Sequence, residues 1–347
     1  MASAALLFRN SSTTFASRFA HPKASVFSTM ASSTTTTRQF SLDTFLVQPI
    51  QLTNALKKNP TSKLSTSPRV IPLCASWFLP NDPEKRNGYE VFKAGHPPTA
   101  RFFDIDAIAD TSSPYPHMLP NASVFAEGMR KLGIRRDDSI VVYDTHELGI
   151  FSAPRVAWTL QVFGHPAVHL LNNYKLYVQE GHPVEQGEQA QYEESKYPEP
   201  EIDATKVASF EEVKEIAKDH NKEGAEGVQI LDARSLGRWK GTDPEPRPGL
   251  SSGHIPGSFS VPVPELLDPE TKVLLPKEKL QDIFKEKGID PAKPIISSCG
   301  TGVTATIIDA ALTEAGFPDT NRRVYDGSWT EWAQRVYPTD NLIHKEI

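Results

Sequence analysis

The segment KGIDPAKPIISSC, residues 287–299, decides the fold because the first half of the chain repeats its pattern. The counterpart is LGIRRDDSIVVYD, residues 132–144. Each copy has Gly-Ile, a charged turn and an apolar run that ends in a polar residue, which predicts a buried strand. At a constant offset of 155 residues, the two copies pair Asp144 with Cys299. The chain is therefore an internal duplication.

The duplication extends to both sides of these strands. In each copy short apolar strands alternate with helices, and that order predicts a mainly parallel sheet flanked by helices on both faces. A chain of 347 residues also exceeds the size at which one core stops growing, about 250–300 residues. We therefore expect an α/β fold with two tandem domains of one type. The paired segments are GHPPTARFFDID (95–106) with GHIPGSFSVPV (253–263), WTLQVFGHP (158–166) with AALTEAGFP (310–318), and the amphipathic helices QLTNALKKN (51–59) with SFEEVKEIAKDH (209–220).

Composition sets the domain boundaries. Residues 1–42 contain no Asp or Glu and are rich in Ser and Thr with interspersed Arg, which is typical of a disordered organelle transit peptide. Residues 183–204 are rich in Pro, Glu and Gln and predict an extended linker. The first domain then covers residues 43–182 and the second covers residues 205–347.

The presequence predicts a mitochondrial matrix protein, with the plastid as the second choice. A plain disordered tail over the same residues is the alternative interpretation. Met30 could start a shorter chain that lacks most of the signal, which would give a cytosolic form.

Charge and hydropathy argue against nucleic acid and membranes as direct binding partners. The net charge is -6, so no broad basic surface is expected to bind nucleic acid or an anionic membrane directly. No apolar run approaches the roughly 20 residues that span a bilayer.

The two cysteines, Cys74 and Cys299, form no disulfide framework, and neither they nor the ten histidines show metal-ligand spacing such as C-x2-C. Cys74 lies in RVIPLCASWF and is interpreted as a core thiol.

Cys299 stands in a different context, SSCGTGVTAT (297–306). It ends a predicted strand, and a helix is expected from about Val303 to Ala315. In open α/β sheets, ligands gather at such strand ends. Gly300 and Gly302 can adopt positive φ, so successive backbone N–H groups can turn inward as an anion-binding nest. With the helix N-terminus, this nest should favour the nucleophilic thiolate.

Two alternatives compete for this loop. The first is a half-buried cysteine that merely precedes a helix. The second is a Cys-x5-Arg phosphatase loop, which needs an arginine six positions after the cysteine to hold phosphate. Ala305 occupies that position, so phosphate-ester chemistry is excluded.

The motifs around this loop resemble two-domain rhodanese-type sulfurtransferases, and within them the 3-mercaptopyruvate sulfurtransferases. The resemblance runs from about residue 43 to residue 340. The motifs that carry it are CGTGVTA (299–305), LDARSLGRWKGTDPEPRPGLSSGHIPG (231–257) and YDGSWTEW (325–332) in the second half, and ARFFDID (100–106), SPYPHMLP (113–120) and GIFSAPRVAW (149–158) in the first.

The resemblance implies a role for the cysteine loop and two arginines. Cys299 would carry a persulfide, stabilised by the loop of Gly300, Thr301, Gly302, Val303 and Thr304. The small residue and hydroxyl after the cysteine favour 3-mercaptopyruvate as donor, with thiosulfate as a weaker one. Arg238 and Arg247 would bind the donor carboxylate, which planar guanidinium groups suit.

The resemblance also implies roles for the first half. Asp106 and His117 would join the Thr301 hydroxyl in a proton relay. Asp144, the counterpart of Cys299, cannot act as a sulfur nucleophile, so the first domain would be catalytically silent. The segment HLLNNYKLYV (169–178) departs from the family pattern.

Two further residues are expected to be structural. Arg234 would brace the cysteine loop, and His254 would hold a turn.

The implied reaction needs neither metal nor organic cofactor. A small-molecule sulfur donor would release pyruvate, and a small thiol, cyanide, or a thioredoxin-like or carrier protein would accept the sulfur. An alternative function is a sulfur-relay protein that hands its persulfide to a protein acceptor in tRNA thiolation or cofactor sulfuration. A catalytically dead binding module is the third hypothesis, and the intact Cys299 loop argues against it.

Overall fold

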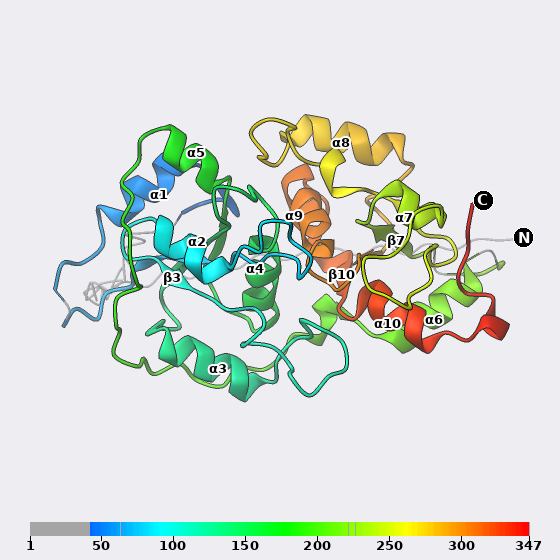
Figure 1. The fold of residues 1–347 in the computed structure, drawn as a ribbon, viewed down its shortest axis with the longest axis horizontal. Helices are drawn as coiled ribbons and strands as arrows, with labels where there is room; N and C mark the ends of the chain where they lie inside the picture. The colour runs from blue at the N-terminus through cyan, green and yellow to red at the C-terminus, as the bar shows by residue number, and fades with distance from the viewer. Residues whose placement is uncertain (1–41, 63, 221, 226, 347) are drawn as a thin grey trace, which may run out of the picture. The chain divides into compact units, whose positions relative to one another are not determined.

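The computed structural model describes residues 42–346, except residues 63, 221 and 226. All but the last residue of the expected transit peptide therefore lies outside the described residues. The described residues belong to one contiguous unit, which contains two sheets of the same design (Figure 1).

The first sheet has five parallel strands in the order β1-β5-β4-β2-β3. Alternate residues of each strand enter opposite faces, because successive side chains of a strand point to opposite sides. In β2, Ile71 and Leu73 join the core under α3 and α4, whereas Val70 and Cys74 join the core under α1, α2 and α5. The strands are β1 (Leu46–Val47), β2 (Val70–Cys74), β3 (Arg101–Phe102), β4 (Ser139–Tyr143) and β5 (Val168–Leu171), and the helices are α1 (Pro49–Leu56), α2 (Gly88–Ala94), α3 (Ala122–Lys131), α4 (Ala153–Val162) and α5 (Tyr174–Gln179).

The second sheet repeats the first in the order β6-β10-β9-β7-β8, again with parallel pairs. Ile295 of β9 faces the core under α8 and α9, and Ile296 faces the core with α6 and α10. The strands are β6 (Val207–Ala208), β7 (Gln229–Asp232), β8 (Phe259–Ser260), β9 (Ile295–Ser298) and β10 (Arg322–Tyr325), and the helices are α6 (Phe210–Asp219), α7 (Leu236–Lys240), α8 (Lys277–Glu286), α9 (Ala305–Ala315) and α10 (Ser328–Arg335). Short 3-10 turns cover Ala204–Lys206, Val263–Glu265, Asp319–Asn321 and Pro338–Asp340.

These observations confirm the predicted α/β class and the duplication. β4 and β9 are the middle strands of their sheets, and Asp144 and Cys299 follow them directly. One detail differs: α9 begins at Ala305 rather than Val303. The residues between Cys299 and the helix thus form a true loop.

The two halves meet along α4 and α9, which contact each other and lie side by side in Figure 1. Their side chains cross the boundary in both directions. Trp158 of α4 belongs to the core of the second sheet, and Ala310 of α9 belongs to the core of the first. A shared apolar boundary of this kind holds the two sheets in a fixed relation.

Two polar contacts cross the boundary at equivalent places. After β10, the Asp326 carboxylate accepts a hydrogen bond from the Leu119 N–H at 2.8 Å. After β5, the Asn172 side chain accepts one from the Leu274 N–H at 2.9 Å. Leu119 and Leu274 are separated by the same 155 residues that relate Asp144 to Cys299. The segment HLLNNYKLYV, which departs from the family pattern, therefore supplies a contact between the halves.

The segment 183–204 has little regular structure but is packed against the first half. Tyr197 is buried, and its hydroxyl lies 2.8 Å from Nδ1 of His165. The Tyr192 ring lies 4.0 Å from the Arg101 guanidinium. The segment therefore covers the first sheet as it leads to the second.

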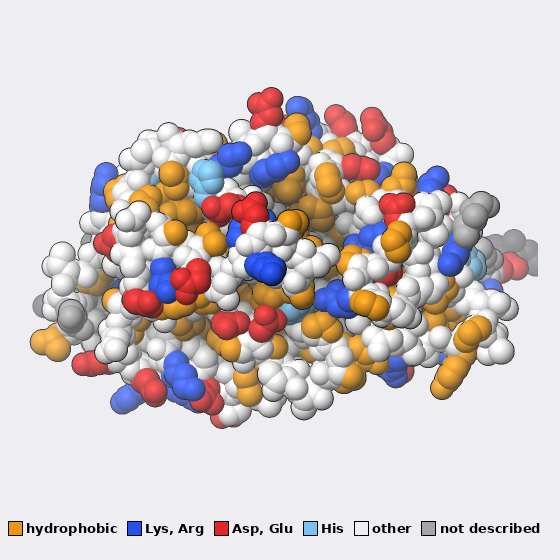
Figure 2. Space-filling view, viewed as in Figure 1, with side chains coloured by type: hydrophobic (Ala, Val, Ile, Leu, Met, Phe, Trp, Pro, Cys, Tyr) orange, Lys and Arg blue, Asp and Glu red, His pale blue; other side chains and the backbone are white. Residues whose placement is uncertain are grey.

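The surface carries no single dominant charge on the face in Figure 2, where acidic and basic side chains are interspersed. Among the described residues, no helix is both long and apolar enough to cross a membrane.

Candidate active site

Cys299 sits at the carboxyl end of the middle strand of the second sheet, between β9 and α9. Its side chain is 1% exposed. The loop of residues 300–304 separates it from the first turn of α9. The loop and the helix N-terminus therefore set the polar environment of the sulfur.

The first turn of α10 orients the start of this loop. The Trp329 N–H donates to the Cys299 carbonyl at 2.9 Å, and Thr330 donates to the Gly300 carbonyl from both its N–H at 2.9 Å and its hydroxyl at 2.7 Å. In a planar trans peptide the C=O and N–H groups point in opposite directions. The N–H groups of Gly300 and Thr301 therefore point away from α10.

The N–H groups of the loop remain open. Within the described ranges, none of the backbone N–H groups of residues 300–305 donates a hydrogen bond to another protein group. Consecutive unpaired amides beside a helix N-terminus attract an anion. The loop thus matches the predicted nest in composition and in hydrogen-bonding capacity.

Ser328 anchors the cysteine itself, and the sequence analysis missed it. Its hydroxyl accepts a hydrogen bond from the Cys299 N–H at 3.1 Å and donates one to the Tyr325 carbonyl at 2.7 Å. Ser328 has a φ of +48°, which is uncommon for a residue with a side chain. The signal available in the sequence was the Gly-Ser step of YDGSW, which begins two residues after the end of β10.

Gly302 is required by the close approach of its neighbours. Its φ is +74°, and a Cβ atom there would lie 2.4 Å from the Asp326 carbonyl oxygen. Only glycine fits this position without moving the backbone.

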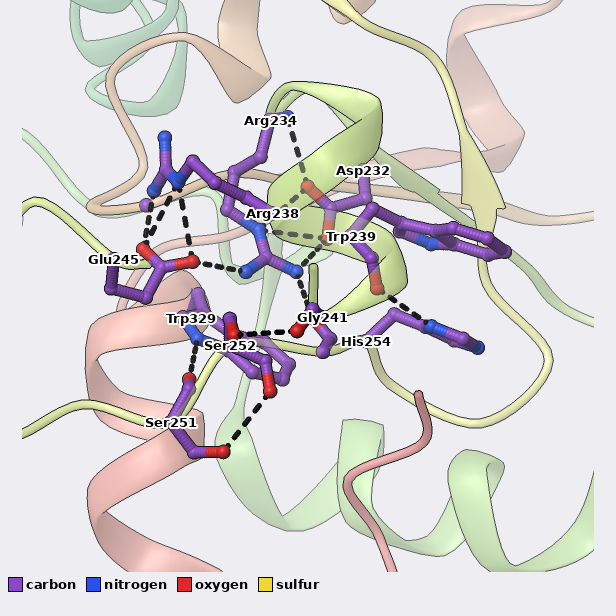
Figure 3. Close-up of polar contacts among 12 residues, drawn as sticks. Asp232, Arg234, Arg238, Trp239, Gly241, Glu245, Ser251, Ser252, His254 and Trp329 are labelled. Carbon is purple, nitrogen blue, oxygen red and sulfur yellow. Dashed lines mark hydrogen bonds and ion pairs between the residues drawn. The ribbon is translucent and has the colours of Figure 1, made fainter. Parts of the chain in front are cut away.

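The structure places Arg234 and Arg238 around a carboxylate that the sequence analysis did not single out, that of Glu245 (Figure 3). Arg234 lies 2.7 Å from one Glu245 oxygen and also binds Asp232 at 2.6 Å, and its side chain is almost fully buried. Arg238 donates from Nε to both Glu245 oxygens at 3.2 Å. A Cβ at Gly300 would lie 3.4 Å from the Arg238 guanidinium, so that arginine borders the cysteine loop.

Arg247 differs from Arg238 because its guanidinium forms no ion pair with a described residue. Its side chain forms no hydrogen bond or ion pair with any residue in the described ranges. Burial lowers the pKa of Arg247, and attraction to Cys299 opposes that shift. Since the guanidinium remains charged well above neutral pH, Arg247 supplies a free cation near the cysteine.

Asp106 and His117 of the first half lie together. Nδ1 of His117 is 3.0 Å from the Asp106 carboxylate, which also accepts a hydrogen bond from the Trp77 indole at 2.9 Å. The close approach of His117 is the main cause of the lowered pKa of Asp106. His117 is buried, whereas the Asp106 side chain is 60% exposed. Among the described residues, no hydrogen bond joins Thr301 to this pair.

Arg155 of α4 joins the two halves at the cysteine loop, and the sequence analysis did not single it out. Its guanidinium lies 2.6 Å from the Asp326 carboxylate and 3.3 Å from the Gly302 carbonyl oxygen. It also donates to the His117 carbonyl. A charged residue within the otherwise apolar run APRVAW was the signal that could have identified it.

Asp144 fills its own loop in the first half. Its carboxylate accepts hydrogen bonds from the N–H groups of Phe151 at 2.7 Å, Ser152 at 3.0 Å and Ala153 at 3.0 Å, and from the Ser152 hydroxyl at 2.7 Å. Burial raises the pKa of Asp144, and these hydrogen bonds oppose the shift. The nest that stays open beside Cys299 is therefore occupied here by a side chain.

Cys74 and His254 lie within packed regions. Burial raises the pKa of Cys74 to about 12, so its thiol is a poor nucleophile. The His254 ring stacks on Trp239 with the centroids 3.8 Å apart, and its Nδ1 lies 2.9 Å from the Trp239 carbonyl oxygen (Figure 3).

Comparison with known proteins places this geometry in context. Residues 211–335 match the family model for the rhodanese-like domain. The chain is 43% identical over 283 residues to thiosulfate sulfurtransferase TUM1 of Saccharomyces cerevisiae, covering 78% of this chain and 90% of that protein. The crystal structure of Tum1 superposes with a TM-score of 0.77 at 40% identity and covers 87% of this chain and 98% of that one.

Two other relatives extend the likeness. Human 3-mercaptopyruvate sulfurtransferase is 38% identical over 269 residues, covering 77% of this chain and 86% of that protein. The sulfur transferase subunit of yeast mitochondrial complex I superposes with a TM-score of 0.77 at 39% identity, covering 88% of this chain and all of that one, 100%.

Proposed function

The chain belongs to the rhodanese-type sulfurtransferases and transfers sulfur from a donor to an acceptor, and from this premise we propose that Cys299 is the residue that carries the sulfur. One observation carries the proposal. Cys299 faces a loop whose amides are unpaired, next to the unshared cation of Arg247. Such an arrangement suits a group that becomes anionic during reaction.

The proposed donor is 3-mercaptopyruvate, with thiosulfate as a weaker substrate. The human relative is named for the first donor and the yeast relative for the second. The carboxylate of mercaptopyruvate would bind Arg247, which forms no ion pair with a described residue, with Arg238 beside it. Thiosulfate, a dianion with no carbon carboxylate, would find only one unshared cation among the described arginines at this loop.

The proposed first half-reaction forms a persulfide. The Cys299 thiolate attacks the sulfur of mercaptopyruvate, and a new S–S bond forms as the C–S bond breaks. The electron pair of the C–S bond moves into the enolate of pyruvate, which takes a proton and leaves. The outer sulfur gives up the thiol proton of the donor, which replaces the proton that the enolate took. The persulfide therefore keeps the negative charge, and the amides of residues 300–304 would stabilise it.

The proposed proton source is the Thr301 hydroxyl, resupplied by His117 and Asp106. The 3.0 Å separation of His117 and Asp106 supports the first link. Kinetics of two variants, His117→Gln and Thr301→Val, test the link to Thr301. Each variant should lower kcat more than it raises the KM of the donor.

In the second half-reaction a nucleophilic acceptor attacks the outer sulfur and regenerates the Cys299 thiolate. The acceptor we propose is a small thiol or a thioredoxin-like or carrier protein, with cyanide as an assay acceptor. The two steps predict ping-pong kinetics.

We also propose the boundaries and the location. Residues 43–182 would form the silent domain, 183–204 the connection and 205–347 the catalytic domain. Mitochondrial matrix import is supported by the acid-free presequence and by the mitochondrial complex I subunit among the relatives.

A steady-state comparison of 3-mercaptopyruvate with thiosulfate tests the donor, and mass spectrometry of the peptide that contains Cys299 tests the carrier. We expect the peptide to gain one sulfur atom after exposure to the donor. Cys299→Ser is the control and should show no gain. A clear preference for thiosulfate would refute the donor, and an unmodified wild-type peptide would refute the carrier.

A further inference from the structure

We infer that Arg155, a residue of the silent half, positions the catalytic loop by holding the peptide between Gly302 and Val303. The inference rests on the proposed role of Cys299 as sulfur carrier. It assigns to the first half a task beyond the supply of Asp106 and His117: it keeps one persulfide-stabilising amide in place.

The contacts of Arg155 join groups that lie far apart in the chain. Its side chain is 4% exposed, and its guanidinium lies 2.6 Å from Asp326 and 3.3 Å from the Gly302 carbonyl oxygen. A second nitrogen donates to the His117 carbonyl, and the guanidinium lies over the Trp158 ring at 4.7 Å. One planar cation thus reaches the catalytic loop, the strand end after β10 and the segment that carries His117.

The hydrogen bond to Gly302 determines the direction of the next amide. Because the peptide is planar and trans, a carbonyl fixed toward Arg155 turns the Val303 N–H to the opposite side. The Val303 side chain is 2% exposed and packs in the core of the first half, which restrains the same peptide from its other end. The direction of this N–H is therefore set by contacts with the first half rather than by the loop alone.

Close packing leaves the peptide little room to rotate. A Cβ at Gly302 would lie 2.9 Å from the Arg155 guanidinium and 2.4 Å from the Asp326 carbonyl oxygen. Arg155 and Asp326 therefore enclose the glycine from two sides.

The chemistry of this contact calls for arginine. A guanidinium presents five N–H donors in a fixed fork and can serve three acceptors together. A lysine could preserve the charge opposite Asp326, but its single ammonium group could not reach the same acceptors. Asp326 in turn neutralises the buried cation, which would otherwise be strongly destabilising.

The chain provides its own matched control at the same boundary. Asp326 accepts from Leu119, and at the equivalent place Asn172 accepts from Leu274. Neither Asn172 nor Leu274 contacts the cysteine loop through a hydrogen bond among the described residues. Asp326→Leu and Asn172→Leu therefore remove equivalent contacts between the halves, but only the first releases Arg155.

The test compares Arg155→Lys, Arg155→Met, Asp326→Leu and Asn172→Leu in the full chain. Three quantities are measured: the single-turnover rate of persulfide formation with 3-mercaptopyruvate, the lifetime of the persulfide without acceptor, and the midpoint of urea unfolding. We expect Arg155→Lys, the mildest change, to lower the rate of formation about tenfold and to shorten the lifetime, below the roughly 10²–10³-fold cost of losing a direct donor. The donor KM should stay close to that of the wild type, because Arg238 and Arg247 are untouched.

Asn172→Leu should lower the unfolding midpoint while both persulfide measurements stay at the wild-type level. The inference is overturned if Arg155→Lys forms and keeps its persulfide like the wild type, or if Asn172→Leu loses as much rate as Asp326→Leu at equal stability. These results would leave Cys299 as the carrier. If the wild-type chain forms no persulfide on Cys299, the proposed function and this inference both fail.

Discussion

The Asp144 carboxylate lies 2.7 Å from the Ser152 hydroxyl and fills the loop that, in the other half of the chain, stays open in front of Cys299. Both residues follow the middle strand of their sheet and precede a helix. A thiol in that place leaves the amides unpaired, whereas a carboxylate satisfies them. In the first half, the N–H groups of the nest therefore bind the Asp144 carboxylate. In the second half, the N–H groups of the nest beside Cys299 remain unpaired.

Replacing Asp144 should affect stability and leave catalysis intact. Asp144→Ala removes the acceptor of three N–H groups, two of them buried, so the free energy of unfolding should fall by about 3 kcal/mol, as measured by urea denaturation. Asp144→Asn keeps one acceptor oxygen and should lose less. A fully stable Asp144→Ala protein would contradict the closed-nest interpretation.

Arg247 and Arg238 should differ in their effect on the donor. Because Arg247 is unshared, Arg247→Ala should raise the KM for 3-mercaptopyruvate about 10- to 100-fold, the equivalent of one hydrogen bond to a charged group, with little change in the unfolding midpoint. Arg238→Ala should raise the KM less, since Glu245 already occupies that guanidinium. Steady-state kinetics measure the KM of each variant. If Arg238→Ala raises the KM as much as Arg247→Ala does, or more, Arg247 is not the main residue that binds the donor carboxylate.

Acid should destabilise the first half through His165. Burial lowers the pKa of His165 to about 4, and its Nε2 donates to the Asp138 carbonyl while its Nδ1 accepts from Tyr197. The unfolded chain binds a proton at this histidine below about pH 6.5, whereas the folded chain does not until about pH 4. Unfolding therefore takes up a proton in that window, and stability falls as the pH falls through it.

The size of this effect is up to about 3 kcal/mol across the window. Urea denaturation from pH 7 to pH 4 measures it. His165→Phe should be less stable at pH 7 but should show a shallower loss toward pH 4. Parallel stability curves for the two proteins would refute a neutral buried His165.

Cys74 should be dispensable for turnover. Its thiol is buried with a pKa raised to about 12, and it lies in the first half, away from the loop of Cys299 in the second sheet. Cys74→Ala should keep kcat/KM within about twofold and lose about 1 kcal/mol of stability through a small cavity. Activity assays and denaturation of the same preparation measure both, and an inactive but folded variant would show that the core-thiol interpretation is wrong.

Local patterns were sufficient for the architecture. Apolar runs and their repetition predicted both sheets and placed Cys299 at the carboxyl end of a strand, because side-chain periodicity is recorded within short stretches of chain. The pairing of the strands then showed that this strand is the middle one of its sheet. The start of α9 was placed two residues too early, since carbonyl groups of the loop accept hydrogen bonds from α10 and Arg155 rather than from the helix itself.

The sequence by itself determined the duplication, the α/β class, the position of Cys299 after a strand and the glycine-rich loop, because each depends on residues that are neighbours in the chain. Only the tertiary structure decided that Glu245 occupies Arg238, that Arg247 remains unshared, and that Arg155 reaches Gly302 across the boundary between the halves. The Arg155–Gly302 contact joins residues that meet only when the two sheets dock, through the packing of α4 against α9. The pairing of Arg238 with Glu245 depends instead on how the segment after α7 folds back on that helix, and no local pattern encodes either arrangement.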